Sequence, residues 1–448
     1  MYYSVTKGGL GMNKSLAASI MAIYGSLVYL SSVLGGYVGD RLLSTQKTVF
    51  FGGVLIMFGH ISLSLPFGKI ALFISIILIT IGSGFLKPNI SNMVGNLYSP
   101  DDVRRDSGFT IYVFGINLGA FIAPILVPWA QGKFNFHVGF SLAAIGMFLG
   151  LVFYLQGSNK YLSRKSFKVT NPLKNNEKAS LIKKIIAGVI IFVIIIGLLK
   201  IFGKLNIDNF INLLSIIGVL TPVVYFAVFL TSKKVSKIER SRIYAYIPLF
   251  LAAVVFWGIE EQGSVVLALF AQEQTQNHIL GFVINPANYQ TLNPFFIMLY
   301  TPVFAFLWTH LGKKQPSSPN KFALGMIITG FSYFLMVIPI MLFGPHKLVS
   351  PLWLVGSWAI VEIAEMLISP IGLSVTTELA PKAFQSSMMS MWFLADAAGQ
   401  AITSQIVKFY TRSTEIPFFA IIATISVICG IILFLMSKKI KVLMRGVL

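Results

Sequence analysis

Charged residues interrupt several of the long apolar stretches in this 448-residue sequence. They are Lys87, Glu260, Glu261, Glu362, Glu365 and Asp396. A charge at the centre of a membrane-spanning helix costs at least about 2.5–3.5 kcal/mol, so such a residue usually faces a cavity and a partner. The lysine lies in the first half of the chain and the five acids lie in the second. Opposite charges on two halves can attract across a cavity, and protonation of the acid would weaken that attraction.

The spacing of the glutamates indicates how they are used. Glu260 and Glu261 are adjacent, and neighbouring residues on a helix point about 100° apart, so we expect them to have different partners. Glu362 and Glu365 are one turn apart and share a helix face. Their mutual repulsion favours a proton on at least one of them, which suits a site that exchanges protons. The alternatives are a structural ion pair for either member of the first pair, and contact with another helix for Glu362.

The remaining polar residues of the spans have two readings each. Lys87 follows Gly82 and Gly84, which let other helices approach closely, and precedes Pro88, which loosens the helix. This sequence favours a lysine that faces a cavity. The alternative is a lysine whose ammonium group extends to the membrane surface. Asp396 lies about a turn after an aromatic pair at 392–393. Buried amides occur at two further positions, where they could contact a ligand or bond a neighbouring helix. These amides are Asn117 and Asn293.

Composition requires lipid as the solvent for most of the chain. Hydrophobic residues make up 56% of the sequence and charged residues 11%, whereas a soluble protein carries roughly 25% charged residues. A spanning helix needs about 20 mostly apolar residues. Stretches that meet this requirement lie near 17–39, 48–67, 70–95, 108–131, 137–156, 183–203, 209–231, 244–270, 293–311, 322–343, 351–377, 385–410 and 416–437. We therefore predict an all-α integral membrane protein with thirteen spans.

The basic residues fix the predicted orientation. With these spans, 25 of the 35 Lys and Arg residues fall on the side that holds the C-terminus and nine fall on the other side. This asymmetry predicts a cytoplasmic C-terminus. Thirteen spans would put Met1 outside, and the first group has five helices where the last has six. We therefore expect that the first helix of the fold is missing upstream of Met1; the alternative is a genuine thirteen-span protein.

With that helix restored, the plan is six, two and six helices. Two six-helix bundles with a substrate site between them are the architecture of the major facilitator superfamily. The predicted domains are an N-terminal bundle (1–156), a basic cytoplasmic linker (157–182), an inserted helix pair (183–231) and a C-terminal bundle (232–448).

Several other classes of protein fit the sequence poorly. The net charge of +20 is spread over loops, which argues against a nucleic-acid partner. A single cysteine argues against a disulfide framework or a thiolate metal site. A channel would need repeated polar rings along a pore, and an enzyme would need clustered ligands or a nucleophile with its base. We expect no enzymatic activity, no metal and no cofactor other than a proton gradient.

Motifs along the whole chain resemble those of the bacterial proton-dependent oligopeptide transporters, the peptide branch of the major facilitator superfamily. The matching segments are 35–41 (GGYVGDR), 84–89 (GFLKPN), 114–119 (FGINLG), 260–264 (EEQGS), 365–370 (EMLISP) and 391–394 (MWFL). The inserted helix pair is also a feature of bacterial members.

The resemblance implies roles for individual residues. It places the substrate among Tyr29, Lys87, Asn117, Trp257, Asn293, Glu365, Trp392 and Phe393. Glu365 and Asn293 would receive the amino end of a peptide. Proton coupling would involve Glu260 and Glu261. The outer gate would pair Lys14 with Glu273, with lysine in place of a more usual arginine.

Two departures from the family pattern bear on this expectation. The family's first helix carries a Glu-x-x-Glu-Arg motif that is absent here, and Asp396 stands where a small polar residue is expected, adding an acid to the substrate pocket. The predicted function is proton-coupled symport of di- and tripeptides by alternating access. The expected surroundings of the protein are membrane lipid. The sequence leaves the oligomeric state undetermined, and a monomer is plausible. The alternatives are a carrier of nitrate, another anion or a drug-like molecule on the same fold, and an inactive truncated product.

Overall fold

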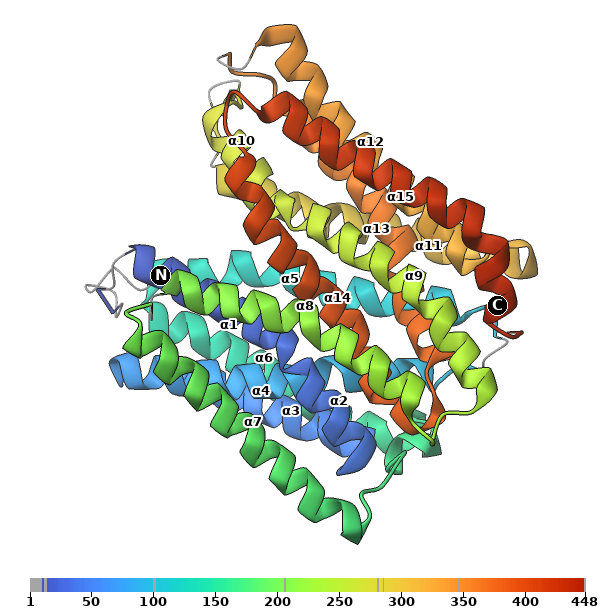
Figure 1. The fold of residues 1–448 in the computed structure, drawn as a ribbon. Coiled ribbons are helices and arrows are strands. Elements are labelled where there is room, and N and C mark those ends of the chain that lie inside the picture. Colours follow the sequence, from blue (N-terminus) through green and yellow to red (C-terminus); the bar gives the residue numbers. More distant parts are fainter. Residues whose placement is uncertain are drawn as a thin grey trace. The chain divides into compact units, whose positions relative to one another are not determined.

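The computed structural model describes residues 10–11, 14–99, 102–204, 207–279, 282–284, 286–344 and 347–446. Most of them are helical (Figure 1). The helices of the first half are α1 (Lys14–Leu30), α2 (Ser32–Arg41), α3 (Thr45–Ser64), α4 (Gly68–Gly95), α5 (Arg105–Lys133), α6 (Phe136–Tyr161), η2 (Arg164–Phe167), α7 (Asn175–Ile201) and α8 (Ile207–Thr231).

The second half is built in the same way. Its helices are α9 (Lys237–Glu260), η3 (Gly263–Leu267), α10 (Ala268–Glu273), η4 (Pro286–Thr291), α11 (Leu292–Leu311), η5 (Gly312–Lys314), α12 (Ser318–Phe343), α13 (Leu352–Leu379), η6 (Lys382–Phe384), α14 (Gln385–Ile406), η7 (Val407–Phe409) and α15 (Glu415–Leu443). Two strands of two residues each, β1 (His278–Ile279) and β2 (Phe282–Val283), pair antiparallel.

Every predicted span coincides with helix, which confirms the all-α prediction. Within the described part of the chain, ten helical segments are long and apolar enough to cross a membrane. The predicted spans 17–39, 183–203 and 385–410 are helical but are not among these ten. The count of thirteen spans and the predicted domain boundaries therefore stay predictions. The structure also divides two predicted spans, since 17–39 is broken at Ser31 between α1 and α2 and 244–270 runs through α9, η3 and α10.

The chain forms two compact units. Unit 1 contains residues 1–93, 130–224 and 382–390, and unit 2 contains residues 94–129, 225–381 and 391–448. Helices α4, α5, α8 and α14 pass from one unit into the other. In unit 1, α3 packs along α6. In unit 2, α12 packs along both α13 and α15, and α9 packs along α13 and α15 (Figure 1).

A buried carboxylate holds the start of α14 within unit 1. Asp40, at the end of α2, is fully buried. Its two oxygens accept hydrogen bonds from the backbone N–H groups of Ser386 and Ser387 at 2.8 and 2.7 Å. The first N–H groups of a helix have no partner inside the helix, and a negative charge there also complements the helix dipole. Asp40 therefore caps α14 and ties it to α2.

The segment after α6 is attached to the same corner. The backbone N–H of Asn171 donates to the carbonyl of Asp40, and that of Leu173 donates to the carbonyl of Arg41. Arg41 also forms an ion pair with Glu177 on α7, with 2.6 Å between the guanidinium and the carboxylate. The predicted basic linker is therefore fixed to the end of α2 through its backbone as well as its charges.

Glycines and backbone acceptors allow the helices of unit 2 to pack closely. A Cβ added at Gly330 or Gly430 would lie within 2.7 Å of atoms on the facing helix of the α12–α15 pair. Hydroxyl groups then reach carbonyl oxygens across helices: Ser426 on α15 donates to Met326 on α12, and Tyr333 on α12 donates to Ile259 on α9. Small residues and hydroxyl bonds of this kind hold helices together in lipid, where apolar burial alone provides little force.

Ion pairs anchor the beginning of α5 within unit 2. Lys321 on α12 is almost fully buried and donates to Asp106 at 2.7 Å, while its ammonium group lies 4.0 Å from the ring centroid of Trp308. Beside it, Arg105 lies 3.4 Å from Glu378 at the end of α13. Buried charges are tolerated where each has an opposite partner and hydrogen bonds.

We predict that Asp40→Ala lowers the melting temperature of the purified protein, because two N–H groups at the start of α14 lose their acceptor, a loss of about 1–2 kcal/mol. Asp40→Asn keeps one acceptor oxygen and should lower it less. Differential scanning fluorimetry in detergent measures both shifts.

The control is Asp102→Ala, since the partner of Asp102 is the largely exposed Arg104 and an exposed ion pair contributes little. Equal melting temperatures for Asp40→Ala and Asp102→Ala would contradict the capping role.

Candidate functional site

The first part of the site lies where α9 changes to η3. Ser236 and Glu239 form a reciprocal capping box at the start of α9, and the helix then continues to Glu260. After Glu261 the chain forms the π-helical turn η3 before α10. Single π turns inside helices widen the backbone locally and are frequent at functional sites. Gly263 opens this turn, and a Cβ added there would lie 2.4 Å from the ring of Trp358 on α13.

A cavity of about 280 Å³ lies beside this turn, within unit 2. Its lining combines three carboxylates with two indoles, two amides and a hydroxyl. The lining residues are Trp257, Glu260, Glu261, Ser264, Gln290, Asn293, Trp358 and Glu365. They come from α9, η3, η4, α11 and α13. The predicted residues Trp257, Glu260, Glu261, Asn293 and Glu365 are therefore brought together at one cavity.

Amide groups divide the acids of this region into two sets. The side-chain NH₂ of Asn293 donates to Glu260 at 2.8 Å and to Glu362 at 2.9 Å. That of Gln400 on α14 donates to Glu261 at 3.0 Å and to Asp396 at 3.2 Å. Glu260 and Glu261 thus have different partners, as the helical geometry of adjacent residues predicts.

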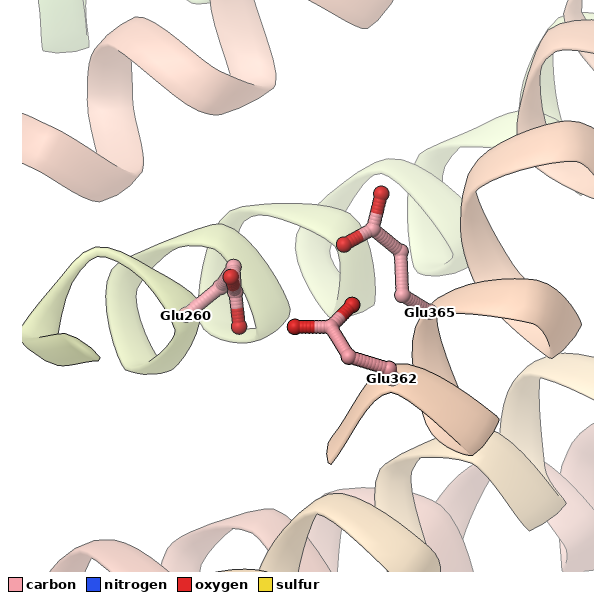
Figure 2. A group of neighbouring side chains, drawn as sticks. All are labelled: Glu260, Glu362 and Glu365. Atoms are coloured by element: carbon pink, nitrogen blue, oxygen red, sulfur yellow. The ribbon is translucent and has the colours of Figure 1, made fainter. Parts of the chain in front are cut away.

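The first set, Glu260 and Glu362, forms a tight group of three carboxyl groups together with Glu365. One oxygen from each of Glu260, Glu362 and Glu365 lies within 4.8 Å of the others, and all three side chains are buried. Figure 2 shows Glu260 on α9 and the other two on α13, with their carboxyl groups directed toward one another. Two unit charges at this distance repel by roughly 3–4 kcal/mol even at an effective dielectric constant of ~20. The three groups therefore favour a state that contains a proton or another cation.

Aromatic rings close one side of the group. Trp257 on α9 and Trp392 on α14 meet edge to face with 6.3 Å between ring centroids, and Phe322 on α12 meets Trp392 in the same manner. Gly372 on α13 makes room for Trp392, since a Cβ there would lie 2.1 Å from the indole. The predicted pocket residues Trp257 and Trp392 are therefore in contact, and Phe393 beside them is half-buried.

The predicted site residues of the first half have local partners. The ammonium group of Lys87 on α4 lies 4.2 Å from the ring centroid of Tyr29 on α1, within unit 1. A cation over an aromatic face is stabilised by the ring's charge distribution. Asn117 is buried and donates to the carbonyl of Val113 in its own helix, α5. The structure does not test the predicted attraction between Lys87 and the acids.

The structure describes the side chain of only one of the two predicted outer-gate residues. Glu273, at the end of α10, is exposed and lies 3.4 Å from Arg412. Lys14 is the first residue of α1, and its side chain lies outside the described residues. The pairing of Lys14 with Glu273 therefore stays a prediction, and Arg412 is a partner that the sequence did not suggest.

Sequence reasoning missed several residues of the site. Gln400 lies four residues after Asp396, a spacing that places both on one helix face, so helical periodicity could have indicated it. Gln290, whose amide donates to the carbonyl of Gly263 at 3.0 Å, lies in an irregular segment that gave no signal. Trp358 lies on a helix face that the sequence does not distinguish from an ordinary packing position.

Comparisons with known proteins agree with the fold and the motifs. The POT family model matches residues 46–428. "Uncharacterized transporter YclF" of Bacillus subtilis (strain 168) is 48% identical over 452 residues, covering 100% of this chain and 90% of that protein. The "Di-/tripeptide transporter" of Lactococcus lactis subsp. cremoris is 48% identical over 446 residues, covering 98% of this chain and 89% of that protein.

A solved structure shows the same architecture. The crystal structure of peptide transporter POT in complex with sulfate has a TM-score of 0.79 and 47% sequence identity to this chain, and the match covers 100% of this chain and 90% of that one. These matches confirm the resemblance drawn from the motifs. The chain belongs to the POT family, and it is a multi-pass membrane transporter of the major facilitator fold and not an enzyme.

Proposed function

We propose that this chain carries di- and tripeptides across the plasma membrane together with protons, by alternating access. The observation that carries the proposal is the cavity of unit 2, in which the buried carboxyl group of Glu365 lies beside a second acid and an amide donor. This cavity occurs in a POT-family chain that is 48% identical to a protein named as a di-/tripeptide transporter.

The chemistry of the cavity suits the amino end of a peptide. An ammonium group needs oxygen acceptors, and Glu365 and Glu260 provide them at the cavity wall. The side chain of Trp257 lines the same cavity, and its buried indole N–H has no acceptor among the described residues. The indoles of Trp257 and Trp358 line the cavity and would bind varied side chains through apolar contact area, and we assign Trp392, which contacts Trp257, and Phe393 to the same binding role.

We assign the carboxyl end of the peptide to Lys87 and give Tyr29 and Asn117 further binding roles. The support is the resemblance of residues 84–89 and 114–119 to family motifs, together with the contact between Lys87 and Tyr29. Lysine attracts a carboxylate through a full positive charge, and a tyrosine hydroxyl or an asparagine amide can donate hydrogen bonds to it.

Energy for accumulation would come from the proton gradient, without a metal or organic cofactor. We assign proton coupling to Glu260 and Glu261 and the outer gate to Lys14 and Glu273. The uneven distribution of basic residues supports a cytoplasmic C-terminus. We expect the protein to interact with its substrate and with membrane lipid, and not with nucleic acid. A monomer is consistent with this function.

We predict that Lys87→Ala and Glu365→Ala each abolish acid-driven dipeptide uptake, because each removes the charge that we assign to one end of the peptide. The assay is accumulation of labelled Ala-Ala in proteoliposomes with an acidic exterior. Lys204→Ala and Glu415→Gln are the controls, since the first residue is exposed and the second lies outside the cavity. A parent protein that accumulates no dipeptide would overturn the proposed function.

Coupling is tested with Glu260→Gln and Glu261→Gln. Each variant keeps the size of the side chain and removes the proton-binding group, so we expect loss of gradient-driven accumulation with exchange of internal for external dipeptide retained. If both variants accumulate dipeptide to the parent's level, the assignment of coupling to this pair is wrong.

We predict that Asp396 biases the pocket toward peptides with a basic side chain, because an additional carboxylate in a low-dielectric site favours a cationic partner. Asp396 lies one turn after Trp392 and is linked through Gln400 to Glu261, which is a cavity residue. The assay compares competition by Ala-Lys, Ala-Ala and Ala-Glu for the parent and for Asp396→Ser. An unchanged ranking in the serine variant would mean that Asp396 serves packing and not selectivity.

A further inference from the structure

Glu362 is less accessible than the other two acids of the carboxyl cluster formed by Glu260, Glu362 and Glu365. Glu260 and Glu365 line the cavity, whereas Glu362 does not and is 0% exposed. One oxygen of each of the three lies within 4.8 Å of the others, and Figure 2 shows the carboxyl group of Glu362 directed toward those of Glu260 and Glu365. Glu362 is therefore a hidden acid in direct reach of the acid that we assign to the peptide's amino end.

The hydrogen bonds of Glu362 leave one oxygen without a donor. Its Oε1 accepts from Asn293, whose two amide hydrogens are used by Glu362 and Glu260. Its Oε2 is buried and has no donor among the described residues. A buried carboxylate oxygen without a donor is costly. One oxygen of Glu365 nevertheless lies within 4.8 Å of an oxygen of Glu362, and two carboxyl groups can form a hydrogen bond with each other only when one of them carries a proton.

Among the described residues, the titratable groups that face this cluster are acids and phenols. They are Glu260 and the neighbouring Glu261 beyond α9, Tyr300 on α11, Tyr333 on α12, and the more distant Asp396 on α14. Tyr333 donates its hydroxyl hydrogen to the carbonyl of Ile259 and so cannot donate it to Glu362. The described surroundings thus provide amides, phenols and further acids, and a proton is the smallest species that relieves the repulsion.

We propose that Glu362 is the proton reservoir behind Glu365. In the empty carrier the two carboxyl groups share one proton. When a peptide ammonium group binds at the cavity, that proton moves entirely to Glu362, and Glu365 becomes the carboxylate that pairs with the ammonium. No bond other than the O–H bonds is made or broken, and the number of protons on the pair stays at one.

This proposal rests on the proposed function and explains one requirement of symport. A symporter must hold proton and substrate at the same time, whereas a single carboxyl group cannot keep its proton and also neutralise an ammonium ion. Placing a second acid behind the first solves this conflict, because the ligand meets Glu365 at the cavity wall while the proton remains on a side chain that the cavity does not reach.

The first measurement needs no peptide. Infrared spectra of the full-length chain in detergent, recorded during a pH titration, report protonated carboxyl groups through their C=O stretching band. We expect a band from a buried carboxylic acid that persists at neutral pH in the parent and in the control Glu415→Gln, and that is lost in Glu362→Gln. Glu415 is a matched control because it is also a buried glutamate of unit 2 and accepts a hydrogen bond from Gln274.

The second measurement adds Ala-Ala and a proton gradient in proteoliposomes. Glu362→Gln should retain dipeptide exchange while gradient-driven accumulation falls by about tenfold or more. Glu362→Asp, which keeps a titratable group, should recover part of both the band and the accumulation, whereas a purely structural role would not depend on whether the side chain titrates.

Three results would overturn the proposal. In the first, the band persists unchanged in Glu362→Gln. In the second, the parent shows no such band and added Na⁺ changes its carboxylate spectrum, which identifies a metal cation in the cluster. In the third, Glu362→Gln accumulates as much dipeptide as the parent. Failure of the proposed function gives a different result. In that case the parent binds no dipeptide, but the carboxylic acid band is still lost in Glu362→Gln. The proton on Glu362 would then be established, whereas peptide transport and the proton transfer that depends on it would be wrong.

Discussion

Repulsion among buried carboxyl groups is the constraint on which this site depends. Glu260, Glu362 and Glu365 lie close together away from water, in a chain that needs lipid around most of its surface. Charges in such surroundings are stabilised only by partners or by protonation. The nearest donor is the single amide of Asn293, which serves two of the three acids. The cluster is therefore built to hold a cation, and the proton is the cation that a carrier can take from the gradient.

The fold satisfies this constraint by controlling how close the helices approach. Gly263 lets the π turn after α9 lie against Trp358 of α13, and Gly372 accommodates the indole of Trp392. These contacts place acids from two helices beside a cavity without filling it. A larger residue at Gly263 would collide with Trp358, and one at Gly372 would collide with Trp392.

The two amide bridges give neighbouring acids different surroundings. Glu260 joins the hidden cluster through Asn293, while Glu261 joins Asp396 through Gln400. The two glutamates therefore have different hydrogen-bond partners, although they are consecutive in the chain.

The sequence by itself determined the solvent, the helical class, the family and the identity of most chemical groups, because apolar runs, in-span charges and short motifs are local properties. Tertiary structure decided which acids meet. Helical periodicity shows that Glu260 and Glu261 diverge and that Glu362 and Glu365 share a face, but it carries no information about contacts between α9, α11 and α13. The role of Glu362 depends on those contacts, since its depth behind the cavity is set by helix packing and not by its neighbours in the chain.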